Sequence, residues 1–303
     1  AEIKNPVWIA PRHLNWSQVK TIETTATPSV AFDKKNEILY IVSVDTLYKF
    51  SFKTNQLTGS KLSKSRKTLP AGNQSIYDDN FNRLHNYFID EKTVSTYDAA
   101  ENAWKLNFSA KPKLTEFWQA NKFISSFDSA LYIIGGYGQL KYKNLVQRFS
   151  FRDNTWEVLQ TKGDFFMPRY LSALGTNAAT DTAYIIGGYG SKTGDQRVAS
   201  KYNFELMAYS VSGRRFNHIY NFKQPEKEFC FANSLIIDDK ANQFYGLIFP
   251  IDKFNSHLQL IRGSLSSPEY EFLGDSIPYS FHDIESFADL YYCPSSKKLV
   301  GVT

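Results

Sequence analysis

Short runs of β-branched and aromatic residues recur along the chain, and polar segments rich in turn formers precede them. The runs lie at 37–44, 85–89, 130–136, 182–188, 243–249 and 298–302. Segments such as DKKN (33–36) and DDKAN (238–242) come directly before two of them. Runs of this length between polar turns are typical of antiparallel strands, and helix signals are nearly absent. The pattern therefore predicts a chain built from many short strands.

The strands recur at a regular spacing. Equivalent positions in successive runs are held by Tyr40, Tyr87, Tyr132, Tyr184, Tyr245 and Val300. A period of about fifty residues with variable loops is typical of radial or solenoid repeats. Four units then carry two large apolar residues seven positions apart: Phe50 and Leu57, Tyr97 and Trp104, Phe149 and Trp156, Tyr209 and Phe216. Turn formers separate each pair, so its members are expected on adjacent antiparallel strands, which gives four strands per unit.

Two units carry a glycine doublet at the end of a strand. The doublets are Gly135-Gly136 and Gly187-Gly188, and Arg169 stands before the inner strand of the fourth unit. Together with the seven-residue aromatic pairs, these features resemble the kelch-repeat β-propellers, the class that includes the galactose-oxidase-like proteins. The resemblance implies an all-β, six-bladed propeller with four-stranded antiparallel blades. The other four units lack the doublet.

A single β-propeller domain is expected over residues 1–303. Its blades are placed approximately at 17–60, 68–108, 115–160, 165–220, 226–275, and 280–303 together with 1–16. Ile9 and Trp16 stand at the same seven-residue spacing, so the N-terminal segment is expected to supply the outer strand or strands of the last blade. Such closure would pair otherwise open strand edges. The alternative is a chain that lacks a further C-terminal strand.

Composition and charge exclude several classes of protein. A hydrophobic content of 42% rules out intrinsic disorder. The net charge of +5 is dispersed, and the one basic run, at 60–67, is interpreted as a solvated loop, so no nucleic-acid partner is expected. No apolar run approaches the ~18 residues of a membrane span, which predicts no direct membrane insertion. Two cysteines, Cys230 and Cys293, exclude a disulfide scaffold, and two buried thiols are favoured over a bridge.

The loops that enter first strands and those that join second to third strands emerge on one face of such a fold. Loops on a rigid scaffold are where ligands usually bind. The candidate ligand-binding residues on this face are Trp118, Arg169, Tyr170, Glu228, His282, Asp283, Glu285, Arg197 and Tyr142. Trp118 does not fit outer-strand packing, so it is a candidate for stacking on a sugar or holding a peptide; the alternative is packing between blades. Arg169 suits either a ligand or nearby backbone carbonyls.

Catalytic motifs are weak. The five histidines are scattered, and the chain has no HExxH, GxSxG or CxxC motif. The Gly-Tyr-Gly runs at 136–138 and 188–190 lack the other residues of a phosphate loop. No catalytic residue, metal or cofactor is therefore nominated.

The sequence favours a non-catalytic recognition propeller that binds a protein, peptide or glycan through its loop-rich face. An extracytoplasmic location is expected, as a module of a larger surface or signalling protein, because the chain begins at Ala1 without a methionine. One alternative is a sugar-acting enzyme of the mutarotase or oxidase type, which requires Arg169, Glu228 or the 282–285 cluster to converge at the channel mouth. Another alternative is an intracellular kelch adaptor.

Overall fold

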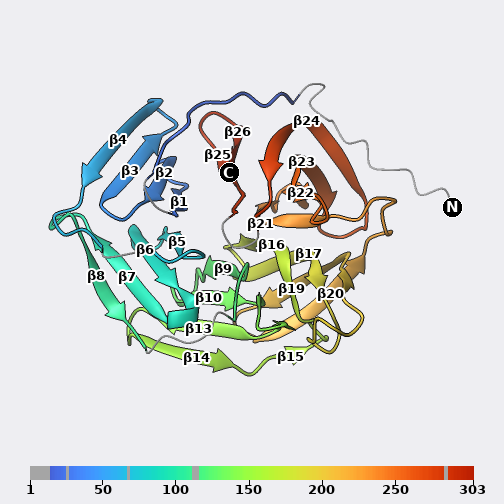
Figure 1. The fold of residues 1–303 in the computed structure, drawn as a ribbon. Helices are drawn as coiled ribbons and strands as arrows, with labels where there is room; N and C mark the ends of the chain where they lie inside the picture. Colours follow the sequence, from blue (N-terminus) through green and yellow to red (C-terminus); the bar gives the residue numbers. More distant parts are fainter. Residues whose placement is uncertain (1–13, 25–26, 67–68, 111–115, 283–285) are drawn as a thin grey trace.

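The computed structural model describes residues 14–24, 27–66, 69–110, 116–282 and 286–303 (Figure 1). Within these residues the regular secondary structure is β-strand, apart from one 3-10 helix, η1 (Ile89–Glu91). The predicted all-β class with four-stranded antiparallel sheets is confirmed.

Three separate sheets of four strands come first along the chain, each with its strands in chain order. The first holds β1 (Ser29–Asp33), β2 (Ile38–Val42), β3 (Thr46–Ser51) and β4 (Gln56–Lys61). The second holds β5 (Gln74–Asp78), β6 (Arg83–Phe88), β7 (Thr93–Asp98) and β8 (Ala103–Phe108). The third holds β9 (Asn121–Ile124), β10 (Leu131–Ile134), β13 (Val146–Ser150) and β14 (Thr155–Leu159).

Two further four-stranded groups follow. The fourth group holds β16 (Arg169–Asn177), β17 (Thr182–Gly190), β19 (Glu205–Ser210) and β20 (Arg215–Asn221). The fifth holds β21 (Cys230–Asp238), β22 (Gln243–Phe249), β23 (Asn255–Ser264) and β24 (Tyr270–Ser280). A single parallel bridge between Leu174 and Ser234 joins these two groups into one sheet.

The remaining strands are short or paired in twos. β25 (Asp289–Cys293) and β26 (Lys298–Val302) form the last sheet, and β11 (Tyr137–Gly138) pairs with β12 (Lys141–Tyr142) as a hairpin. β18 (Lys201–Tyr202) pairs with the end of β17, and β15 (Lys162–Gly163) runs parallel to β20.

The four aromatic or apolar pairs predicted to lie on adjacent strands are direct cross-strand partners. Phe50 faces Leu57, Tyr97 faces Trp104, Phe149 faces Trp156, and Tyr209 faces Phe216. In the last three pairs the ring centroids lie 5.5, 5.1 and 4.8 Å apart. These residues anchor the third and fourth strands of their sheets against the neighbouring sheet.

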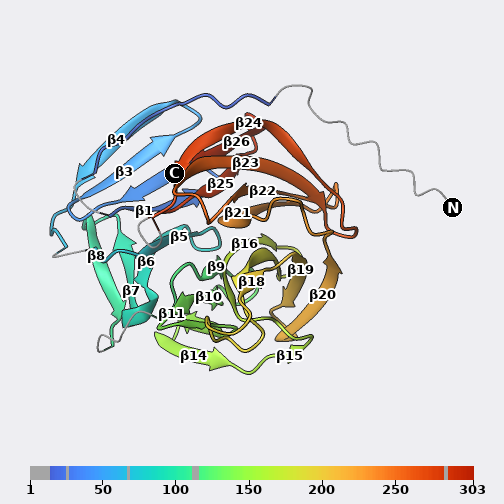
Figure 2. The same cartoon turned by 45° about the vertical axis from the view of Figure 1, so that its right-hand side comes forward.

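The sheets lie in chain order around a common centre, with their first strands innermost and their fourth strands at the rim (Figures 1 and 2). Polar side chains join the inner strands. The hydroxyls of Ser29 (β1) and Ser75 (β5) are 2.6 Å apart. The amide nitrogen of Asn121 (β9) donates to the carbonyls of Ser172 (β16) at 2.7 Å and Asn233 (β21) at 3.1 Å. The inner strands are therefore held together by hydrogen bonds as well as by packing.

The two ends of the strand series come close together. The ring of Phe32 in β1 stacks on that of Tyr291 in β25, with 4.8 Å between centroids. Trp16 packs into the hydrophobic cluster of the fifth group and the last sheet, and the carbonyl of Leu14 accepts a bond from the Asp275 amide of β24 at 3.1 Å. No strand pairing among the described residues closes the last sheet onto the first. Most of the predicted closing segment, residues 1–13, lies outside the described residues.

The second sheet contains a buried histidine, His85. The ring of His85 stacks on Phe151 at 3.9 Å between centroids, and its Nδ1 bonds the Thr96 hydroxyl at 2.8 Å. Its Nε2 is buried without a partner, and burial lowers the pKa of His85 to about 3. The stabilisation from a neutral His85 is therefore complete above the unfolded pKa near 6.5 and is lost as pH falls toward about 3.

We expect His85→Phe to remove this part of the acid sensitivity. The wild-type free energy of unfolding should fall, relative to the variant, by roughly 1.4 kcal/mol for each pH unit below about 6. Urea denaturation of both proteins between pH 7 and pH 4.5 measures the difference. His218→Phe, at an exposed site in β20, controls for the loss of a histidine. Parallel pH profiles for wild type and His85→Phe would contradict the prediction.

Candidate functional site

The glycine doublet at the end of β10 lets several loops meet on one face. Gly135 and Gly136 have φ of +75° and +110°, which side chains rarely tolerate. A Cβ on Gly136 would lie 2.9 Å from the Cα of Phe117, and the Gly136 amide donates to the Arg169 carbonyl at 2.9 Å. The doublet thus brings β10 against the segments that enter β9 and β16.

The β11–β12 hairpin emerges from this doublet and pairs with the segment before β9. The amide of Trp118 donates to the Tyr137 carbonyl at 2.8 Å, and the Tyr137 amide donates back to Trp118 at 3.0 Å. The loop that enters a first strand and the loop that follows a second strand are therefore hydrogen-bonded on one face.

Six aromatic side chains from the third sheet and the fourth group form a continuous set of ring contacts on this face, here called the aromatic cluster: Trp118, Tyr137, Tyr142, Tyr170, Tyr189 and Tyr202. Tyr137 lies in the middle, with its ring centroid 6.3 Å from Trp118, 5.3 Å from Tyr142 and 5.0 Å from Tyr170. Tyr142 continues to Tyr189 at 6.1 Å, and Tyr189 to Tyr202 at 5.2 Å. Tyr142 is buried and the other five are half-buried, so the cluster has both a packed side and an accessible side.

Hydrogen bonds hold the cluster against the loop that follows β17. The Tyr142 hydroxyl donates to Ser200 Oγ at 3.1 Å, and the Tyr142 amide donates to the Gly194 carbonyl at 2.7 Å. The Tyr137 hydroxyl bonds the side chain of Gln196. Burial raises the pKa of Tyr142 and of Tyr202, so these phenols stay neutral and can both donate and accept. Tyr137 and Tyr142 are thus tied by hydrogen bonds to the loop after β17.

The two candidate arginines of this region lie at different depths. Arg169 is 1% exposed, and its guanidinium donates to the Met167 and Gly187 carbonyls at 3.0 Å and pairs with Glu205. It therefore lies in the protein interior, where it bonds other groups of the protein. Arg197 is exposed on the loop after β17, where its pairing with Asp195 at 2.7 Å lowers the pKa of that carboxyl to about 2.

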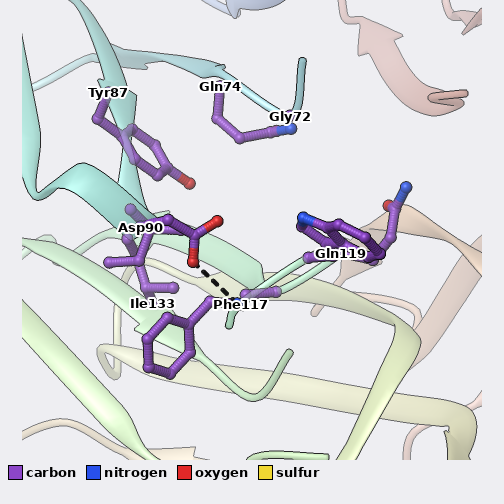
Figure 3. A pocket seen from close by; sticks show the side chains of 10 residues that line it. Gly72, Gln74, Tyr87, Asp90, Phe117, Gln119 and Ile133 are labelled. Atoms are coloured by element: carbon purple, nitrogen blue, oxygen red, sulfur yellow. Dashed lines mark hydrogen bonds between the residues drawn. The ribbon is translucent and has the colours of Figure 1, made fainter. Parts of the chain in front are cut away.

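A small polar cavity, lined by residues from the second and third sheets and the segments before them, shares Trp118 with the cluster (Figure 3). The phenol of Tyr87, the carboxylate of Asp90 and the amide of Gln74 point into it, and Trp118 lines it with a buried Nε1 that has no hydrogen-bond partner. Asp90 accepts from the amides of Glu116 at 2.7 Å and Phe117 at 3.0 Å, while burial raises its pKa. The cavity encloses about 20 Å³, room for about one water molecule.

Polar contacts link the inner strands of different sheets near this cavity. The Gln119 amide nitrogen donates to the Ser286 carbonyl at 3.1 Å, which links the third sheet to the segment before β25. Lys122 bonds the side chain of Gln74 and interacts electrostatically with buried Asp289 in β25. These contacts tie the inner strands of the second, third and last sheets to one another.

The remaining candidate residues are not part of the cluster. Glu228 is exposed and accepts a bond from Gln224 at 2.8 Å. His282 is exposed, with its ring centroid 4.1 Å from that of Phe254, and Asp283 and Glu285 lie outside the described residues. The enzyme alternative required Arg169, Glu228 or the 282–285 cluster to converge at the channel mouth. In the structure the carboxylate that pairs with Arg169 is that of Glu205, which was not a candidate. In the described part of the chain no three His, Cys, Asp or Glu side chains are grouped to hold a metal ion.

Of the six members of the cluster, the sequence analysis nominated Trp118, Tyr142 and Tyr170. The loops assigned to this face also contained Tyr137 and Tyr189, and only Tyr202 was missed. A signal for Tyr202 is present in the repeat. Lys141-Tyr142 stands seven residues before Phe149, and Lys201-Tyr202 stands seven residues before Tyr209. Aligning these segments would have placed Tyr202 at the position of Tyr142.

A comparison with known protein families identifies the sequence motif that forms the third sheet. Residues 121–163 match the kelch motif. The matched stretch contains all four strands of that sheet and the β11–β12 hairpin of the aromatic cluster. The match is consistent with a kelch-repeat protein and confirms the resemblance predicted from the sequence. The kelch motif supports a protein-interaction or recognition module.

Three further findings concern related proteins, membrane spans and the cysteines. The search of curated proteins found no match. No helix in the described part of the chain is long and apolar enough to span a membrane. Cys230 and Cys293 are both free and buried, as predicted.

Proposed function

We propose that the chain is a non-catalytic, six-bladed β-propeller that recognises a partner protein through the aromatic cluster and its surrounding loops. Ring closure is part of the proposal. It is supported by the stacking of Phe32 on Tyr291 and by two bonds from Ser295, the amide at 2.7 Å and the hydroxyl at 2.6 Å, to the carboxylate of Glu37. These contacts join the last sheet to the first.

The observation that carries the recognition role is the rigid aromatic cluster. Tyrosine and tryptophan are enriched at binding hot spots, because they supply large contact area with few rotatable bonds and a polar group. Here five half-buried rings come from two different repeats, and their loops are fixed by backbone hydrogen bonds. A surface that is ordered before binding loses little conformational entropy when a partner docks.

Selection from a displayed library of random peptides tests the proposal. We expect the wild-type chain to enrich peptides whose affinity falls at least ~10-fold with Trp118→Ala or Tyr137→Ala, because each change removes a ring from the docking surface. Binding is measured by fluorescence anisotropy with the selected peptides, and near-UV circular dichroism checks that each variant folds. Phe81→Ala is the matched control, since Phe81 is an exposed aromatic in the β5–β6 turn.

The outcomes separate the partner classes. Selected peptides that bind both cluster variants as tightly as wild type would overturn the proposal, as would failure to enrich any peptide. A glycan array run beside the selection gives the alternative: binding to glycans that is lost with Trp118→Ala would favour a lectin. The extracytoplasmic location stays a prediction, tested by fractionation of cells that express the tagged natural gene.

A further inference from the structure

The tip of the β11–β12 hairpin holds an exposed leucine in an unfavourable backbone conformation. Gln139 and Leu140 form the two-residue turn, with φ of +53° and +60°. This turn favours Gly, Asn or Asp, and a branched apolar residue is disfavoured there. Leu140 is nevertheless 54% exposed, so burial in the chain's own core does not offset the strain. Strain of this kind, kept without a packing gain, is a feature of functional sites.

The hairpin tip is held firmly by the loop that follows β17. The Gln196 amide donates to the Leu140 carbonyl at 3.0 Å, and Lys141 forms a β-bridge with Asp195. Two residues further along, Val198 is 47% exposed. Leu140 and Val198 therefore lie on adjoining, mutually hydrogen-bonded segments beside the aromatic cluster. We call the segments 139–142 and 191–201 the loop tip.

The loop tip carries more positive than negative charge. The loop tip contains Lys141, Lys192, Arg197 and Lys201, all exposed, and a single acidic residue, Asp195. Asp195 is paired with Arg197, whereas no described carboxylate forms an ion pair with Lys192 or Lys201. Cationic side chains around exposed apolar residues are complementary to an acidic segment with an apolar anchor.

We propose that the loop tip binds an acidic segment of the partner protein, whose apolar side chain packs on Leu140 and Val198 while its carboxylates face Lys192 and Lys201. This inference rests on the recognition role proposed above and specifies the chemistry of the partner. An apolar anchor supplies most of the lifetime of such a complex, and the charges speed association and give it a salt dependence. Peptides enriched by the wild-type chain should therefore be rich in Asp and Glu around a Leu, Ile, Met or Phe.

The decisive variant is Leu140→Asn, because it should move stability and binding in opposite directions. Asparagine tolerates positive φ, so the variant should unfold about 2 °C higher. It lacks the apolar anchor, so affinity for the enriched acidic peptides should fall at least ~10-fold. Arg214→Asn is the matched control, which relieves a positive φ of +47° in the exposed β19–β20 turn, outside the loop tip, and should raise stability without changing affinity. A structural role for Leu140 would not give higher stability together with weaker binding.

A second variant tests the charges. Lys192→Glu with Lys201→Glu should weaken binding at least ~10-fold at low salt and flatten its dependence on salt concentration. Lys34→Glu with Lys35→Glu, in the exposed β1–β2 turn, should change neither. Vesicles containing phosphatidylserine serve as the competing anionic surface.

Three results would overturn this inference. The first is enrichment of peptides without acidic residues that still need Trp118 and Tyr137, which would leave the recognition role intact. The second is wild-type affinity for acidic peptides in Leu140→Asn or in the double lysine variant. The third is binding to phosphatidylserine vesicles, but not to peptides, that depends on Lys192 and Lys201. Failure to enrich any peptide would count against the recognition role as well.

Discussion

Replacing Arg169 with methionine should lower the free energy of unfolding by about 3–5 kcal/mol. The guanidinium is fully buried at the start of β16 and uses each of its nitrogens: Nε bonds the Met167 carbonyl, Nη1 the Gly187 carbonyl, and Nη2 the carboxylate of Glu205. Methionine fills much of the same volume but donates no hydrogen bond. The two carbonyls would lose this donor, and the largely buried Glu205 carboxylate would lose its cation and keep the 3.2 Å bond from the Asn203 side chain. Leaving one member of a buried ion pair without its partner is strongly destabilising.

Urea denaturation of Arg169→Met measures the effect, and Arg148→Met is its matched control. Arg148 also pairs with carboxylates, bonding Asp128 and Glu157 at 2.9 Å, but its side chain is 20% exposed, against none for Arg169. Water can hydrate the partners that Arg148 leaves, so its loss should cost less than about 1 kcal/mol. Equal losses for the two variants would show that burial of Arg169 does not set its contribution.

A second variant, Glu205→Gln, separates the contribution of the Arg169–Glu205 ion pair to stability from that of the hydrogen bonds to the two carbonyls. Glu205→Gln keeps a hydrogen-bond acceptor for Arg169 but removes the opposite charge, so it should be less destabilising than Arg169→Met. Combining the two changes should cost less than the sum of the single losses, because each removes part of the same network. Additive losses would indicate that Arg169 is held by the two carbonyls alone.

The fold was readable from the sequence because its signals repeat. The strand of each unit was marked by the same kind of apolar run, and residues seven positions apart predicted cross-strand pairs such as Tyr97 with Trp104, which the structure confirms. Hairpin pairing depends on local turns and on alternation of side chains, and both are local properties of a sequence.

The candidate site was only partly readable, because it depends on contacts between distant loops. Trp118 was singled out as a tryptophan without an outer-strand role, yet its pairing with Tyr137 follows from backbone bonds between two loops. Leu140 gave no signal, since only the positive φ of its turn makes an exposed leucine unusual. The second sheet lacks a glycine doublet; there η1 and the Asp90 carboxylate hold the neighbouring loop through the Phe117 amide.

Substituting alanine for Gly187 should destabilise the protein by roughly 3 kcal/mol, through two separate causes. Its φ of +69° is strained for any residue with a Cβ, and that Cβ would lie 2.3 Å from Cδ2 of Phe231 in β21. Phe231 is 1% exposed within the hydrophobic cluster between the fourth and fifth groups, so its ring has little room to move. Gly213→Ala is the matched control, because its added Cβ would meet nothing closer than 3.4 Å.

Thermal and urea denaturation of Gly187→Ala alone and together with Phe231→Leu separate the two causes. Phe231→Leu by itself opens space in the core and should lower stability by about 1–2 kcal/mol. In the Gly187→Ala background the smaller side chain relieves the clash, so the double variant should be more stable than the sum of the two losses predicts. The loss of stability that Gly187→Ala still causes in the Phe231→Leu background is due to the strained backbone, since leucine at position 231 leaves the positive φ of residue 187 unchanged. Strictly additive losses would mean that Phe231 moves aside freely, and that the doublet is needed for its backbone conformation alone.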